Sequence, residues 1–177
     1  MTLPMFAADE HIVIDADRDW WCTPPHIVEV VRDALGGRID FDPCSNPLSM
    51  VGAGFTVEAA ADGLSAPWPA PVCGYCNPPY SDPAPWMQRC ADAGDLNSRF
   101  VGCIKADTST IWWHRSIWQR AKAICFPSRR VAFLPPPGVE ASTPDFAVAF
   151  PFWAPARGDA VDTFTRVMSS IGKVVIL

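Results

Sequence analysis

The sequence predicts an α/β fold in which one sheet carries helices on both faces. Short apolar runs alternate along the chain with segments whose apolar residues recur at helical spacing, and proline and glycine separate them. The 177 residues are enough for one domain with its own core. We expect an acid-rich arm over residues 1–19 and a single domain over residues 20–177, with ligands bound at the carboxyl ends of strands.

The first predicted helix begins at Thr23, whose hydroxyl is expected to cap it, and two prolines follow in the first turn. It ends at the glycine pair 36–37, because glycine readily adopts the backbone conformation that closes a helix. A short strand is expected over residues 38–42, and residues 44–62 are expected to be irregular.

Downstream, each predicted strand is a short run of apolar residues, and each predicted helix has apolar residues three and four positions apart. The strands are expected at residues 72–76, 100–104, 123–126, 129–134, 146–150 and 173–177, and the helices at 84–93, 110–121 and 161–170. The strands at 129–134 and 146–150 are expected to pair with each other.

The composition excludes several classes of protein. Hydrophobic residues make up 49% of the chain and charged residues 19%, which is typical of a globular protein and not of a disordered one. No apolar run is long enough to span a membrane, and no export signal is evident. Seven cysteines in such a chain indicate reduced thiols in a cytoplasm. Cys73 and Cys76 form a CxxC pair without two matching ligands, so we expect buried strand residues and no metal.

The net charge of −5 is unevenly distributed. It amounts to −9 over residues 1–88, +5 over residues 89–130 and −1 over residues 131–177. A basic block inside an acidic chain is typical of a surface that faces a polyanion, although a solvated helical face produces the same pattern.

Three side chains of the basic block are candidates for contacts with phosphate: Lys105, which follows the predicted strand 100–104, and Arg129 and Arg130, which begin the predicted strand 129–134. The alternative for each is a structural ion pair. The tryptophans of the predicted helix 110–121 are interpreted as core and rim packing rather than as residues that stack on bases.

The strongest chemical motif is Asn77-Pro78-Pro79-Tyr80, directly after the predicted strand 72–76. Each proline restricts the residue before it and lacks an N–H, so the turn is stiff and exposes the Pro78 carbonyl beside the Asn77 amide. Two converging acceptors can hold both hydrogens of one –NH₂ group, which favours a tetrahedral nitrogen able to attack a methyl group. Tyr80 offers a face on which an extruded base can stack. The alternative is an ordinary proline turn.

Three weaker motifs precede it. Asp42 ends the predicted strand 38–42, where a carboxylate can hold the ammonium of a methionyl group, or simply form a turn. The hydroxyl of Thr23 and the free N–H groups at its helix start can bind a carboxylate, or simply cap the helix. Asp62 can accept a hydrogen bond from an adenine amino group, or be an ordinary loop aspartate.

The order of these motifs resembles the phage-type Dam-like DNA N6-adenine methyltransferases. Thr-Pro, Asp-Pro-Cys, Asp-Gly-Leu with a later Trp, and Asn-Pro-Pro-Tyr-Ser follow one another within residues 20–134. The resemblance implies a Rossmann-like methyltransferase sheet that uses S-adenosyl-L-methionine. It also implies duplex or single-stranded DNA as the partner, in a bacterial or phage-infected host cytoplasm.

The resemblance also implies roles for individual residues. The catalytic residues are implied to be Asn77, Pro78, Pro79 and Tyr80. The cofactor-binding residues are implied to be Trp21, Thr23, Pro24, Asp42, Pro43, Cys44, Asp62 and Asn77. Only 19 residues separate Asp42 from Asp62, so we expect an abbreviated sheet, with Glu58 as the candidate for binding the ribose.

The expected reaction is methyl transfer to adenine N6 without a metal, by positioning and by orientation of the amine. An asparagine in the first motif position is shared by adenine and glutamine enzymes, so a protein glutamine amide stays an alternative, as does cytosine N4. A non-catalytic nucleic-acid-binding relic of the fold is a third. The basic block favours a nucleic acid.

Overall fold

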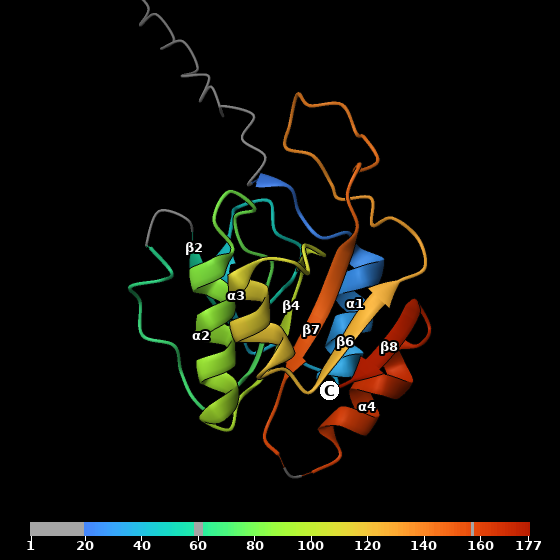
Figure 1. The fold of residues 1–177 in the computed structure, drawn as a ribbon. Helices are drawn as coiled ribbons and strands as arrows, with labels where there is room; N and C mark the ends of the chain where they lie inside the picture. The colour runs from blue at the N-terminus through green and yellow to red at the C-terminus, as the bar shows by residue number, and fades with distance from the viewer. Residues whose placement is uncertain (1–19, 59–61, 157) are drawn as a thin grey trace, which may run out of the picture.

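The computed structural model describes residues 20–58, 62–156 and 158–177, so the expected arm over residues 1–19 lies outside the described residues. It has one sheet with helices on both faces (Figure 1). The strands are β1 (Phe41–Ser45), β2 (Phe55–Glu58), β3 (Cys73–Cys76), β4 (Arg99–Gly102), β5 (Ile104–Lys105), β6 (Ala123–Pro127), β7 (Val148–Trp153) and β8 (Gly172–Ile176). The helices are α1 (Pro25–Ala34), α2 (Ala84–Asp95), α3 (Ile111–Trp113), the π-helical turn η2 (His114–Trp118) and α4 (Ala160–Met168).

The strand order is β2-β1-β3-β4-β7-β6-β8. The short β5 also pairs with β7 but is not part of this linear order. Strands β1, β2, β3 and β4 are parallel, whereas β7 runs antiparallel to both of its neighbours, β4 and β6. Strand β6 therefore points the same way as β1, β3 and β4. The carboxyl ends of these four strands meet at one edge of the sheet, where α/β proteins bind their ligands.

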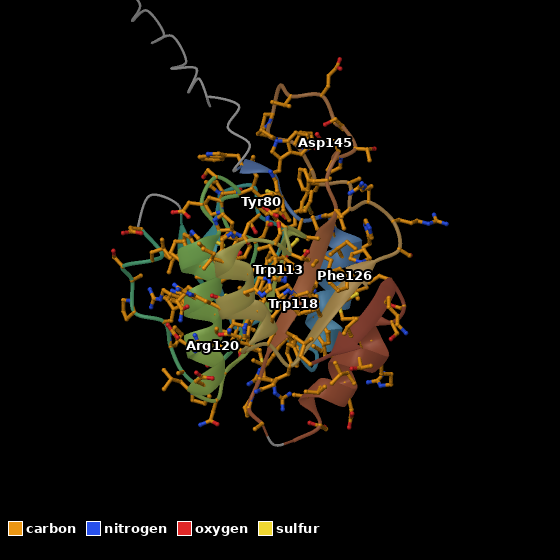
Figure 2. The ribbon with its side chains drawn as sticks, in the orientation of Figure 1. Tyr80, Trp113, Trp118, Arg120, Phe126 and Asp145 are labelled. Carbon is orange, nitrogen blue, oxygen red and sulfur yellow. The ribbon has the colours of Figure 1, made fainter. Side chains whose placement is uncertain are left out.

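Helices cover both faces of the sheet, as predicted. Helices α1 and α4 pack on one face, and their side chains join a core with Tyr75 and Phe152 of the sheet. Helices α2, α3 and η2 cover the other face, around a core that includes Met87, Trp113 and Phe100. Figure 2 shows Trp113 in the interior of the molecule. Among the described residues, no helix is long and apolar enough to cross a membrane.

Strand β2 corrects the prediction that residues 44–62 are irregular. It pairs with β1, with Phe41 opposite Phe55, and these two rings stack with their centroids 5.5 Å apart. With only four residues at an edge of the sheet, β2 has no apolar repeat long enough to be recognised in the sequence.

Strand β1 begins three residues later than the predicted strand 38–42 and continues to Ser45. Asp42, Pro43 and Cys44 therefore lie within the strand rather than after it. The pairing with β2 shifts register between Asp42 and Ser45. Such an irregularity accommodates Pro43, which has no N–H to donate to a neighbouring strand.

The predicted pairing of residues 129–134 with 146–150 is wrong. Strand β7 pairs with β4, β5 and β6 instead, and Leu134 forms only an isolated bridge with Cys22. All six residues of β7 are buried, which suits the centre of the sheet. The segment 129–134 carries two exposed arginines and leads into three prolines, so it cannot continue as a paired strand.

Candidate active site

A cleft of about 590 Å³ opens at the carboxyl ends of β3 and β5. We call it the site cleft. The residues that line it are Trp21, Asn77, Pro78, Tyr80, Ser81, Lys105, Phe133, Ser142, Thr143, Pro144, Asp145 and Phe146. Its far wall is the loop between β6 and β7, orange in Figure 1, and Figure 2 shows Asp145 on this loop at the same end of the molecule as Tyr80.

Asn77 follows directly after β3, and its amide is held in one orientation. Its Nδ2 donates a hydrogen bond to the backbone carbonyl of Trp21 over 3.2 Å. Its Oδ1 is buried, and no donor among the described residues bonds to it. An unsatisfied buried acceptor costs about 1–3 kcal/mol, so it is rare unless a ligand or water completes it. Asn77 lines the site cleft, so the wall of the cleft contains a buried acceptor without a donor among the described residues.

Tyr80 forms an aromatic wall of the site cleft. Its ring meets Phe133 and Phe146 edge-on, with centroid distances of 6.1 and 5.6 Å. The Lys105 ammonium lies 4.7 Å from the Phe146 centroid and 5.8 Å from that of Tyr80. Burial raises the pKa of the Tyr80 hydroxyl well above its usual range, so the side chain stays neutral and offers a π surface.

Asp42 is a buried carboxylate of β1, the strand that pairs with β3, and it is not among the residues that line the site cleft. Its Oδ1 accepts the backbone N–H of Cys44 over 3.1 Å, and no cationic side chain among the described residues pairs with it. Burial raises its pKa from 3.8 to about 6. The Sγ atoms of Cys44 and Cys76 are 3.6 Å apart, which brings the Asp-Pro-Cys motif next to the residue that precedes Asn77.

The predicted N-cap role of Thr23 is wrong. The N-cap position of α1 is Pro24, and no side chain caps the helix. The Thr23 hydroxyl is buried and lies 2.6 Å from the hydroxyl of Tyr75, so it ties the start of α1 to β3. The buried hydroxyl of Tyr75 would otherwise lack this partner, which explains why it prevails over the cap. The Pro24 carbonyl accepts the N–H groups of the first helical turn.

Asp62 precedes Gly63, which packs directly against Pro43 of β1. A Cβ on Gly63 would be 1.9 Å from the Pro43 carbonyl oxygen, so only glycine permits this contact with β1. The Asp62 carboxylate is exposed and accepts hydrogen bonds from the Leu64 N–H and the Ser65 hydroxyl. It forms a turn beside the Asp-Pro-Cys motif. Glu58 is the last residue of β2, opposite Ser45 of β1.

The basic block of residues 89–130 is not one continuous free surface. Three of its arginines have partners within the protein. Arg89 donates to backbone carbonyls and lies over the Trp68 ring, Arg120 pairs with two aspartates of α2, and Arg99 pairs with Asp159. Arg129 and Arg130 are exposed just beyond β6, and neither forms an ion pair within the described part of the chain.

Two interpretations of apparent motifs as structural are confirmed. Trp113 is fully buried, and Trp112 and Trp118 pack against the same core. Cys73 and Cys76 are buried, free thiols of β3. No three His, Cys, Asp or Glu side chains of the described residues are grouped so that they could hold a metal ion.

Sequence reasoning missed the far wall of the cleft. The sequence predicts Phe133 within one strand and Phe146 at the start of another, and it indicates no role for residues 142–145. Their only sequence signal is a polar, proline-containing segment between two aromatic residues, which is also common in ordinary loops.

Comparisons with known proteins indicate the same family as the order of the motifs. The family model of the DNA N-6-adenine-methyltransferases (Dam) matches residues 11–160. A protein of Haemophilus phage HP1 (strain HP1c1), described as a DNA N-6-adenine-methyltransferase, is 25% identical over 120 residues, which cover 67% of this chain and 68% of that protein. The resemblance inferred from the order of the motifs is thereby confirmed. The chain belongs to the DNA N-6-adenine-methyltransferase (Dam) family.

Proposed function

We propose that this protein transfers the methyl group of S-adenosyl-L-methionine to the N6 amino group of adenine in DNA. The observation that carries the proposal is the buried Oδ1 of Asn77, an acceptor without a donor in the cleft beside Tyr80. Family membership supports the same reaction.

The architecture supports a Rossmann-like methyltransferase sheet over residues 20–177. Strands β1, β2, β3, β4 and β6 run in one direction, and β7 is inserted antiparallel between β4 and β6. The helical connections are abbreviated, since no helix connects β1 with β2 and none lies between β2 and β3 in the described residues.

The residues at the ends of β1 and β3 fit the proposed cofactor. Asp42 is a buried carboxylate without a cation, and a methionyl ammonium would supply the charge that its environment lacks. Pro43 and Cys44 continue the same strand and would line the methionyl end. Asp62, which lies beside this strand, would accept a hydrogen bond from the adenine, and Glu58 stays the sequence candidate for the ribose. When bound, S-adenosyl-L-methionine supplies an electrophilic methyl group.

The segment before α1 would complete this end of the pocket. Trp21 lines the site cleft and its carbonyl orients Asn77, while Thr23 and Pro24 are buried behind it. Because the Thr23 hydroxyl already bonds to Tyr75, we assign Thr23 to positioning this segment rather than to a hydrogen bond with the cofactor.

The catalytic work would be done by preorganised acceptors. The Asn77 Oδ1 and the Pro78 carbonyl would accept the two hydrogens of the adenine amine, which turns the nitrogen lone pair out of conjugation with the ring. Trp21 fixes the Asn77 amide before substrate arrives, so no reorganisation is needed at the moment of reaction. Tyr80 and Pro79 would hold the extruded base in place, and Lys105, Arg129 and Arg130 would contact phosphates at the same edge of the sheet.

Mass spectrometry of nucleosides tests the proposal. DNA incubated with protein and S-adenosyl-L-methionine should gain N6-methyladenine, and Asn77→Ala should abolish most of it. Gln119→Ala, which removes an exposed amide from the end of η2, is the matched control and should behave like the parent. Methylation of cytosine N4 or of a protein glutamine would replace the substrate assigned here. Cofactor binding without any methylation of DNA would favour a relic of the fold.

A further inference from the structure

A second cleft lies on the other side of the loop that carries the Asn-Pro-Pro-Tyr motif. Its volume is about 590 Å³, and we call it the α2–α3 cleft. The residues that line it are Ala84, Gln88, Ser109, Thr110, Ile111, Trp112, Arg115 and Ser116. Ser81 lines the site cleft and Ala84 lines this one, so residues three positions apart in the chain border the two clefts.

The α2–α3 cleft combines an apolar surface with one cation. Ile111 is 71% exposed, the most exposed large hydrophobic side chain of the described residues, and the half-buried Trp112 lies beside it. Arg115 is exposed and forms no ion pair within the described residues. No carboxylate lines the cleft, although the chain as a whole has a net charge of −5. Arg115 therefore gives the cleft a cation without a carboxylate partner among the described residues, which can contact a phosphate.

The floor of the cleft is fixed by hydrogen bonds. The Ser116 carbonyl, within the π-helical turn, accepts the indole N–H of Trp153 over 2.8 Å. The Ser116 hydroxyl donates to the side chain of Gln88 over 3.3 Å, and Gln88 donates to Asp92. Arg115 and Ile111 therefore project from a preformed surface, and binding there would not require this segment to fold first.

We propose that the α2–α3 cleft is a second DNA subsite, which receives the strand that flanks the target adenine. Arg115 contacts a backbone phosphate, and the exposed Ile111 contacts a flanking sugar. The inference rests on the proposed function, since it takes DNA as the substrate.

The test compares two variants of the cleft with two matched controls. Arg115→Gln removes the cation, and Arg166→Gln removes an exposed arginine from α4, on the opposite face of the sheet. Ile111→Ser removes the apolar side chain, and Leu96→Ser does the same at the far end of α2, where Leu96 is 64% exposed. All four positions are at the surface, so each variant should fold.

The readouts are the affinity for a fluorescently labelled DNA duplex over a range of salt concentrations, and the affinity for S-adenosyl-L-methionine. Arg115→Gln should weaken DNA binding and reduce the log–log salt slope by about 0.9. Ile111→Ser should weaken DNA binding about tenfold with an unchanged salt slope, because it removes apolar contact and no charge. Both controls should match the parent, and all variants should bind the cofactor equally.

The possible failures are distinguishable. If the parent methylates DNA and the two cleft variants bind it as the controls do, the subsite is refuted while the proposed function stands. If the parent neither binds nor methylates DNA, the proposed function itself fails. If Ile111→Ser changes only the sedimentation behaviour of the protein, the cleft is a contact between two copies of this chain, and the DNA assignment is overturned.

Discussion

Replacing Asp42 with asparagine should stabilise the cofactor-free protein while weakening its affinity for the cofactor. Burial raises the pKa of Asp42 from 3.8 to about 6, so the folded state disfavours the charged carboxylate. A pKa difference of one corresponds to about 1.4 kcal/mol. At neutral pH, keeping the Asp42 carboxylate ionised in the folded state therefore destabilises the protein by about 3 kcal/mol. Asparagine is nearly isosteric, carries no charge and can still accept the Cys44 N–H.

The pH dependence has a definite sign. Below about pH 4 the carboxyl is protonated in both the folded and unfolded states, so Asp42→Asn should have little effect. Between about pH 4 and pH 6 the parent should lose stability relative to the variant, and above pH 6 the difference should be constant. The methionyl ammonium would favour the ionised carboxylate, so the variant should bind cofactor about 10- to 150-fold more weakly.

The assay is urea denaturation at several pH values, with and without S-adenosyl-L-methionine, together with calorimetry of cofactor binding. Asp33→Asn is the matched control, because Asp33 is an exposed aspartate on α1. The reasoning would be refuted by an Asp42→Asn variant that is no more stable than the parent at pH 7.5. Unchanged cofactor affinity would separately remove Asp42 from the proposed cofactor site.

Three further outcomes follow from the geometry. Asn77→Ala should lower kcat about 10²- to 10³-fold at unchanged melting temperature, and near-normal turnover would end its catalytic assignment. Replacing Arg129 and Arg130 together with alanine should lower the log–log salt slope of duplex binding by roughly 2, and the parental slope would place the DNA elsewhere. Gly63→Ala should raise the KM for the cofactor, because its Cβ would collide with the Pro43 carbonyl; titration calorimetry with unchanged affinity would contradict this.

Local features of the chain could be predicted from the sequence because they depend on neighbouring residues. The prolines after Asn77 stiffen their own turn, and the apolar spacing of α1 and α4 is visible within ten residues or so. The order of the motifs led to the right family.

Features that depend on distant partners were missed or misread. Thr23 resembles a helix cap, but its partner is Tyr75, 52 residues away. The segment 129–134 has the composition of a strand, yet β7 pairs with other strands. Phe146 reaches the cleft only because β7 enters the sheet there. No spacing along the chain encodes these contacts, because each depends on which distant segments pair and bury their side chains together in the complete fold.

The central position of β7 has a consequence for how the protein is made. Strands β4 and β6 are both synthesised before β7, but neither contacts the other without it, because β7 lies between them. A growing chain that ends before residue 153 thus presents one unpaired edge of β4 and both edges of β6, and nascent chains aggregate through such edges. The sheet can close only when this late segment leaves the ribosome. Nascent chains that end before β7 is complete are therefore expected to be the most prone to aggregation.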